Sequence, residues 1–510
     1  MKLAIPFLFM LLLVSVLAGC AADDDDDNNS VDDDLDDDTA DDDAAPDDDS
    51  TIDDDTAPDD DTTLEPPTVK SLTWIRSTDG RLIDEYGRQW LLYGINARVT
   101  GLFDGDEYWT QATAVYEQWD AQRMAFDGFN LFRLPINWSA IEPVEGQFSE
   151  DYLQQMEQVI AWARDAGLYV LVDFHQDKFS KFIDIGDDGA PKWAVFPPPD
   201  EKIEVSLQFL LAVDAFFNNH EAIQDRFLPA WQLVVSRFAD QPNVIGFEIM
   251  NEPITVFLPF GQQKLYSFYE KVTTAMREVD TRHAIWMEPD VYRNQFLWAP
   301  LRDEPFPDDN VVYEPHMYPN FIGMNYQTVP EWIDALTATF DHILPETQSW
   351  GAAPVIGEWG THPNDSFAPA LFEAIQKLAD ERSIGLAFWV WKEKASGNWG
   401  LFDYDGETET WTERTGSAID ALLRPRVMAV PGRLLSTRFD TATNELSATF
   451  EAAGGEGPPL LYLPQSYYPN GVAVQIDGAS IEIEIDPTTQ RTLLPWNGET
   501  GAHEITVVPQ

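Results

Sequence analysis

Short apolar runs alternate with amphipathic segments along most of the chain after residue 91. Eight runs have the length and composition of buried strands, and apolar residues recur at helical spacing in the segments between them. The runs are residues 91–97, 130–136, 168–175, 244–251, 284–288, 311–316, 354–359 and 386–392, and the helical segments include residues 151–166, 261–279, 330–344 and 367–381. Eight strands that are each followed by a helix predict an α/β fold, a (β/α)8 TIM barrel over residues 68–424.

The pattern changes near residue 425, where helical spacing stops. Apolar residues then alternate with polar ones in short segments that are divided by Gly and Pro turns. These segments are residues 446–450, 472–476, 481–485 and 504–508. They predict a C-terminal antiparallel β-sandwich over residues 425–510. Packing against the barrel is the simpler interpretation of this domain, and carbohydrate binding is the alternative.

The N-terminus has the pattern of a targeting segment. Lys2 precedes an apolar stretch over residues 3–17 that is too short to span a bilayer. The stretch ends in Leu-Ala-Gly-Cys at residues 17–20, which resembles a bacterial lipobox, and Cys20 is the only cysteine of the chain. We therefore expect residues 1–20 to be a lipoprotein signal peptide with Cys20 lipidated. The resemblance implies a lipid-anchored protein of the bacterial cell envelope, at the outer membrane or cell surface; an ordinary signal peptide with a chance cysteine is the alternative.

Residues 21–67 consist largely of Asp triplets separated by Thr, Ala, Pro and Ser. Such a tract cannot bury enough apolar surface to order itself, so it predicts a disordered, charged linker. Calcium-binding loops would be the alternative, but their Gly turn and terminal Glu are missing. The net charge of the chain is −58, and about −35 remains without this tract. This balance excludes a nucleic-acid partner and suits a neutral substrate.

Polar residues gather where the predicted barrel strands end, and the active site of such a barrel lies at those ends. Six of the runs end in this way, with Arg133, His175 and Asp177, Asn251 and Glu252, His316 and Tyr318, Glu358, and Trp391 and Lys392. We find no set of His, Asp and Glu residues at metal-ligand spacing and no Gly-rich phosphate loop before a helix. The sequence therefore predicts neither a metal nor another cofactor.

Two carboxylates that face one cavity suit glycoside hydrolysis, in which one protonates the leaving oxygen and the other attacks the sugar or activates water. Glu252 and Glu358 are the candidates. The motifs around them resemble family 5 glycoside hydrolases over residues 88–424. The resemblance implies that Glu252 is the acid/base, that Glu358 is the nucleophile and that Arg133 keeps Glu358 ionised. It also implies that His175, Asn251, His316, Tyr318 and Trp391 bind the sugar. With Arg133, and with Asp177 and Lys392 from the same strand ends, they form the predicted substrate-binding set.

Several segments are similar to the endoglycoceramidase branch of that family, which releases the glycan of a glycolipid from ceramide. They are residues 94–98, 101–104, 175–177 and 186–194. Two loops expected at the barrel mouth, residues 193–199 and 254–260, are apolar, as a lipid aglycone would require. Packing of these loops on each other or on a helix is the alternative. We therefore expect a retaining endo-β-glycosidase that acts on a glycolipid, with an endo-β-glucanase or β-mannanase as the alternative.

Two other classes of protein fit the sequence less well. A catalytically inactive carbohydrate-binding barrel would not need both carboxylates. A structural surface lipoprotein would not need polar residues at so many strand ends.

Overall fold

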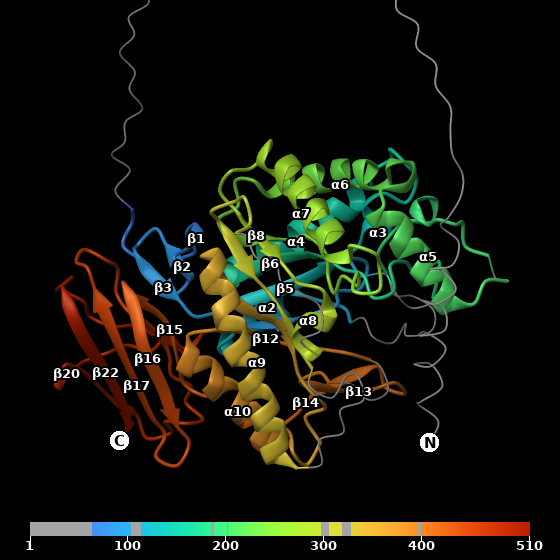
Figure 1. Cartoon of the computed structure of the whole chain (residues 1–510). Helices are drawn as coiled ribbons and strands as arrows, with labels where there is room; N and C mark the ends of the chain where they lie inside the picture. Colours follow the sequence, from blue (N-terminus) through green and yellow to red (C-terminus); the bar gives the residue numbers. More distant parts are fainter. Residues whose placement is uncertain are drawn as a thin grey trace, which may run out of the picture. The chain divides into compact units, whose positions relative to one another are not determined.

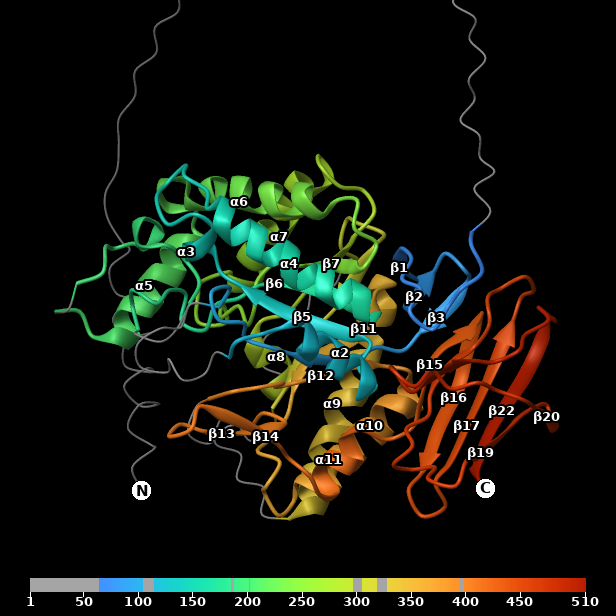
Figure 2. The ribbon, with the colours of Figure 1, turned by 180° about the vertical axis from the view of Figure 1, so that it is seen from behind.

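The computed structural model describes residues 64–103, 114–184, 188–200, 202–296, 305–318, 328–394 and 399–510. Cys20, the predicted signal peptide and nearly all of the predicted linker lie outside the described residues. In the part of the chain that is described, no helix combines the length and apolar character needed to cross a bilayer. Figures 1 and 2 show central strands with helices around them.

The central strands form a closed parallel barrel, which confirms the predicted fold. The strands are β4 (Tyr93–Asn96), β5 (Leu131–Ile136), β6 (Tyr169–Phe174), β7 (Val244–Glu248), β8 (Ala284–Met287), β9 (Val311–Tyr313), β10 (His316–Met317), β11 (Ala353–Trp359) and β12 (Gly385–Phe388). Neighbouring strands pair in this order, β12 pairs with β4, and β11 pairs with both β9 and β10. Because β9 and β10 are two pieces of one predicted run, the barrel has the expected eight strand positions.

Helices cover the outside of the barrel, and several begin and end at recognisable caps. The helices are α2 (Gln118–Phe126), α3 (Trp138–Ile141), α4 (Glu150–Ala166), α5 (Val205–Phe217), α6 (Ile223–Phe238), α7 (Gly261–Arg277), α8 (Val291–Phe296), α9 (Val329–Trp350), α10 (Ala368–Arg382) and α11 (Ser417–Leu422). The Ser149 hydroxyl caps α4, and Gly167 ends it in a left-handed conformation. Helix α9 continues past Pro345, where the sequence pattern had predicted its end.

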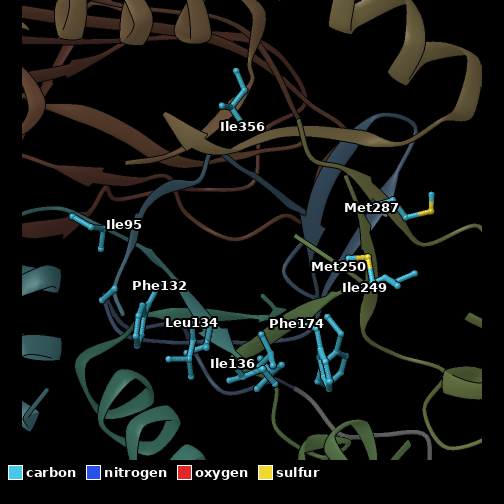
Figure 3. Close-up of a cluster of buried hydrophobic side chains, with 14 of the residues drawn as sticks. Ile95, Phe132, Leu134, Ile136, Phe174, Ile249, Met250, Met287 and Ile356 are labelled. Atoms are coloured by element: carbon cyan, nitrogen blue, oxygen red, sulfur yellow. The ribbon is translucent and has the colours of Figure 1, made fainter. Parts of the chain in front are cut away.

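Side chains of strand β5 alternate between the apolar core outside the barrel and the barrel interior. Phe132, Leu134 and Ile136 are fully buried in the large core cluster shared with the helices, and Figure 3 shows them along β5 with Phe174 of β6 nearby. Since successive side chains of a strand point to opposite faces, Arg133 points the other way, into the barrel. Its side chain is completely buried there. The otherwise apolar strand β5 therefore places the guanidinium of Arg133 inside the barrel.

The C-terminal region forms two packed antiparallel sheets, as the alternating pattern predicts. One sheet contains β16 (Arg433–Asp440), β17 (Glu445–Ala452), β22 (Gly501–Pro509), β19 (Val472–Ile476) and β20 (Ala479–Ile481). The other contains β15 (Arg426–Pro431), β18 (Leu460–Tyr462) and β21 (Arg491–Leu493) together with β1 (Ile75–Thr78), β2 (Arg81–Asp84) and β3 (Arg88–Trp90). Val430, Phe450 and Leu461 belong to the core between the two sheets.

Two details of this region differ from the sequence-based division. Strands β1 to β3 fall inside the range assigned to the barrel, yet they complete the sheet of β15, because β3 pairs with β15. The predicted strand at residues 481–485 is shorter, since β20 ends at Ile481 and Ile483 and Ile485 pack on the core without ladder bonds. Alternation reports burial of every second side chain, and it does not by itself require a strand partner.

The sheet that contains β1 to β3 and β15 packs against one end of the barrel. Trp90, Met428 and Tyr462 of this sheet share an apolar cluster with Leu171 of β6 and Val355 of β11. The packing interpretation of the C-terminal domain is therefore what the structure shows. The apolar cluster fills this end of the barrel, whereas the polar side chains lie toward the carboxyl ends of the strands.

Candidate active site

Arg133 is the centre of the buried polar network inside the barrel. Its Nε and one terminal nitrogen donate to the two oxygens of Glu248 at 2.6 and 2.7 Å. The same terminal nitrogen donates to Asn251 Oδ1 at 2.9 Å, and the other donates to Asn96 Oδ1 at 3.0 Å and to Glu358 Oε1 at 2.6 Å. Arg133 thus holds four side chains by hydrogen bonds. They come from β4, β7, the loop after β7 and β11.

Glu358 lies on β11 and receives donors on both carboxylate oxygens. Arg133 binds Oε1, and the hydroxyl of Tyr318 donates to Oε2 at 3.0 Å. His316 of β10 is the register partner of Glu358 across the parallel pair, and its Nδ1 lies 3.5 Å from Oε2. The carboxylate is therefore oriented by three residues on neighbouring elements.

Glu252 lies in the loop after β7 and is held differently. Its backbone adopts the left-handed region, with φ of 41°, which is uncommon for a residue with a side chain. Oε1 lies 3.0 Å from Nδ1 of His316, and the side chain is 18% exposed. Asn251, the residue before it, donates to the backbone carbonyl of Gln176 at 2.9 Å. Glu252 is the more accessible of the two carboxyls, since Glu358 is 7% exposed.

The two carboxyls are close together. One oxygen of Glu252, one of Glu358 and a nitrogen of His316 all lie within 4.8 Å of one another. Retaining glycosidases have a separation of about 5–5.5 Å, and inverting ones about 6.5–9.5 Å. The geometry therefore fits the retaining arrangement, in which one carboxylate attacks the sugar directly.

Burial raises the pKa of both carboxyls to about 7. The cationic Arg133 opposes this rise at both, but it contacts Glu358 directly. Burial also lowers the pKa of His316 to about 4 and that of His175 to about 3, so both imidazoles are neutral at pH 7. With donors on both oxygens of Glu358, the negative charge of the pair is better stabilised there, and the proton is better placed on Glu252.

His175 follows β6 and contributes to the floor of the site. Its Nδ1 lies 2.6 Å from Asp173 Oδ2, and its Nε2 lies 3.9 Å from Asp177, whose side chain is 43% exposed. The indole of Trp389 lies nearly parallel to the imidazole, with ring centroids 5.9 Å apart and 20° between the planes. Trp389 is partly exposed and is the first residue after β12. It is therefore the aromatic face of this strand end that a sugar could contact.

Trp391 and Lys392, which the sequence analysis placed among the substrate-binding residues, instead contact helix α2. Trp391 is 1% exposed and donates its indole N–H to Asp120 of α2 at 2.9 Å. Lys392 pairs with the same Asp120, and its ammonium lies over the rings of Trp119 and Phe402. Both residues anchor the segment after β12 to α2. The tryptophan of this strand end that lies beside His175 is Trp389, two residues before the predicted Trp391.

The two apolar loops have different environments. In the loop after β6, Trp193 stacks edge-on against Trp138 and donates its N–H to the carbonyl of Glu142, so it packs on the barrel. In the loop after Glu252, Phe257 packs edge-on against Tyr292, whereas Phe260 is 76% exposed. Phe260 also borders a cavity of about 240 Å³ with Thr255, Val256, Tyr266 and Asp290 among its lining residues. The packing alternative thus describes Trp193, and Phe260 remains available to a ligand.

Two groups of side chains have enough nearby donor atoms to hold a metal ion. They are Glu248, Glu288 and His316, and Glu252, His316 and Glu358. Glu248 and Glu358 are engaged by Arg133, and Glu288 accepts a backbone N–H. A cation would have to compete with Arg133 for these ligands, so the donor set fits an arginine-centred carboxylate network.

A family model for cellulase (glycosyl hydrolase family 5) matches residues 83–395. The chain belongs to glycoside hydrolase family 5. A model of the family 5 C-terminal domain matches residues 424–507. The chain is therefore a glycoside hydrolase, and the region after the barrel is a recurrent companion of the family's catalytic barrel.

Family 5 endoglycoceramidases are among the most similar proteins. Endoglycoceramidase I of Rhodococcus hoagii (strain 103S) is 26% identical over 438 residues, which cover 80% of this chain and 84% of that protein. An endoglycoceramidase of Hydra vulgaris is 22% identical, over 78% of this chain and 81% of that protein. The structure of endo-glycoceramidase II from Rhodococcus sp. as a lactosyl-enzyme intermediate is 26% identical with a TM-score of 0.70, covering 84% of this chain and 100% of that chain. Its ganglioside GM3 complex is 25% identical with a TM-score of 0.70, covering 84% and 99%.

The structure also reveals site residues that the sequence analysis missed. They are Asn96, Asp173, Glu248, Glu288, Glu314 and Trp389. Glu314 is fully buried beside Arg133, and a Cβ at Gly357 would lie 1.7 Å from its Oε1, so only glycine fits there. Period-two alternation could have found Asp173 and Glu248, because each lies in an apolar run as a single acid on the face that points into the barrel.

Proposed function

We propose that the protein is a retaining endo-β-glycosidase that cleaves the bond between the glycan and the lipid of a glycosphingolipid. The close pair of Glu252 and Glu358, with Arg133 and Tyr318 binding Glu358, is the observation that carries the chemistry. The relatives named as endoglycoceramidases and the ganglioside complex of one of them support the substrate class. The exposed Phe260 beside the acid/base loop is compatible with a lipid aglycone.

The reaction follows from the positions of the two carboxyls. Glu358 attacks the anomeric carbon while Glu252 gives its proton to the departing oxygen, which leaves as the alcohol of the lipid. Glu252 then removes a proton from water, which attacks the glycosyl-enzyme ester and releases the glycan and the free Glu358 carboxylate. Two displacements at one carbon retain its configuration. The donors on both oxygens of Glu358 favour the proton on Glu252, as the first step requires.

The sugar-binding surface in this proposal consists of His175, Asp177, Asn251 and His316, with Trp389 in place of Trp391. Trp389 offers a ring face next to His175, and stacking on a ring face is how sugars bind aromatic residues. Arg133 is too deeply buried to touch the sugar, and its role is to keep Glu358 ionised and oriented.

A panel of natural substrates tests this function. Glucosylceramide, galactosylceramide, lactosylceramide, a steryl glucoside and cellulose should be incubated with the soluble chain from residue 66, and the products identified. We expect release of intact glycan and free ceramide from at least one glycosphingolipid, and little hydrolysis of cellulose. Efficient cleavage of cellulose or mannan with inert glycolipids would reject the glycolipid substrate and favour a polysaccharide-degrading enzyme.

We further propose that Cys20 is lipidated and anchors the enzyme to the bacterial cell envelope, with the Asp-rich residues 21–67 as a spacer. The lipobox-like residues 17–20 and the uniqueness of Cys20 support this proposal. The full chain expressed in a bacterium should partition into detergent, and Cys20→Ser should move it to the aqueous phase with unchanged turnover of aryl glycosides. A full chain that stays aqueous would contradict the anchor.

A further inference from the structure

The residue that follows β8 contacts the backbone of the acid/base residue. Glu288 is 1% exposed, and its Oε2 accepts the backbone N–H of Glu252 at 2.5 Å. Glu252 has the left-handed φ of 41°, which costs free energy unless the surroundings hold it. The described contacts of the Glu252 peptide include this bond and the bond from Gln176 to its carbonyl at 3.1 Å. Glu288 thus holds the backbone N–H of Glu252, a residue with a strained backbone conformation.

The other atoms of Glu288 are fixed in turn. Its Oε1 lies 3.5 Å from Nδ1 of His316, and its backbone carbonyl accepts the hydroxyl of Tyr269 on α7 at 2.8 Å. Burial, together with Glu252, Glu248 and Glu314, raises the pKa of Glu288 well above its ordinary value. Oε2 of Glu288 serves as the acceptor for the Glu252 amide, and the side-chain oxygen of a glutamine, which has the same shape, could take its place.

We propose that Glu288 is a positioning residue for the general acid: it holds the Glu252 peptide so that the Glu252 carboxyl reaches the leaving oxygen. This inference rests on the proposed role of Glu252. It predicts that loss of Glu288 impairs protonation of the leaving group and spares the attack by Glu358. The two effects separate on substrates that differ only in leaving group, because a good leaving group departs without a proton.

Two aryl β-glycosides of one glycone that the wild-type enzyme hydrolyses provide this separation. One carries 2,4-dinitrophenol, which needs no acid, and the other carries 4-methylumbelliferone, which benefits from one. The measured quantity is kcat/KM for each substrate and their ratio. The variants are Glu288→Leu, which removes the acceptor, Glu288→Gln, which keeps it, and Glu252→Ala as the reference for complete loss of the acid.

A matched control replaces a buried carboxyl away from the site. Glu346 on α9 accepts the hydroxyl of Tyr313 at 2.6 Å and is 7% exposed. Glu346→Leu removes buried polar contacts as Glu288→Leu does, here including the ion pair with Arg293, but no described contact joins Glu346 to Glu252. Any general effect of such a change on folding should leave the ratio of the two substrates at its wild-type value.

Glu288→Leu should lower kcat/KM for the methylumbelliferyl substrate by about 10–100-fold, the range expected when a catalytic group is misplaced. It should lower kcat/KM for the dinitrophenyl substrate by less than about threefold, and Glu288→Gln should stay within about threefold of wild type on both. Equal losses on both substrates with Glu288→Leu, or a Glu288→Gln as impaired as Glu288→Leu, would overturn the proposal. If Glu252→Ala itself showed no dependence on leaving group, the assignment of the acid would fail instead.

Discussion

Glu358 and Glu252 have carboxylate oxygens within 4.8 Å of each other, yet the protein holds the two residues in different ways. Glu358 sits within a barrel strand, and side-chain donors from Arg133 and Tyr318 bind its carboxylate. Glu252 sits in a loop with a left-handed backbone, and the buried Glu288 binds its peptide while His316 lies next to its carboxyl. Donors around a carboxylate stabilise its charge, whereas contacts to the backbone fix position without favouring ionisation. This difference supports the separate roles that we propose for the two glutamates.

Mutations around the two glutamates should therefore have different effects. Changes on the Glu358 side remove charge that attacks the sugar, so they should affect every substrate. Changes on the Glu252 side should depend on the leaving group or the aglycone.

Glu358→Gln should lower kcat for glycolipid by on the order of 10⁴-fold or more, because an amide is a very poor nucleophile. The loss should be similar for dinitrophenyl and methylumbelliferyl glycosides, since both need the attack. Steady-state kinetics and circular dichroism should show an inactive but folded protein. Substantial turnover of a natural substrate by this variant would reject Glu358 as the nucleophile.

Replacing Trp389 and Trp391 separately distinguishes sugar binding from support of the fold. Trp389→Ala should lower kcat/KM by about 10-fold or more. It removes the indole next to His175, and stacking of a sugar on that ring would contribute roughly 1–3 kcal/mol to binding. Trp391→Phe removes the hydrogen bond to Asp120, so it should lower the melting temperature and change kcat/KM by less than about threefold. The reverse result, with Trp391 controlling kcat/KM, would restore the assignment that the sequence suggested.

The sequence predicts the barrel, and it places Glu252 and Glu358 at the same end of it, for physical reasons. Apolar runs and helical spacing report burial, and the carboxyl ends of parallel strands share one face of the barrel, so Glu252 and Glu358 could be placed together. The position of Trp391 could not be predicted, because residues just after β12 no longer alternate as in a strand. Glu288 was missed because a single acid at the end of a run does not show whether it faces a backbone amide. The pairing of β3 with β15 is a long-range contact without a local pattern.

The pH profile should reflect the shared proton of the pair. The active form carries a proton on Glu252 and none on Glu358, so kcat/KM should fall as pH drops through the pKa of Glu358 and as it rises through the pKa of Glu252. Burial raises both pKa values from about 4.5 to about 7. We therefore expect a bell-shaped profile with an optimum nearer neutrality than two exposed carboxyls would give, falling about tenfold per unit beyond each limb.

The variant Glu252→Gln sharpens this prediction. Measured with a dinitrophenyl glycoside, it should keep the acidic limb, which belongs to Glu358, and lose the alkaline limb. An alkaline limb that persists in Glu252→Gln would have to come from another group, and the division of roles between the two carboxyls would be wrong.

Replacement of Phe260 tests whether this residue contacts the lipid aglycone, and its expected effect is small. Phe257 packs against Tyr292, so its replacement would also disturb neighbours of Glu252, whereas Phe260 is 76% exposed and can be changed alone. Covering a large apolar side chain contributes about 1.5–3 kcal/mol, and a partial cover by ceramide would contribute about 1 kcal/mol, or about fivefold. Phe260→Ser should therefore lower kcat/KM on a glycolipid by about fivefold and leave small aryl glycosides within about twofold. Equal losses on both would mean that Phe260 supports the start of α7 and the Glu252 loop, and unchanged glycolipid turnover would place the lipid elsewhere on the barrel mouth.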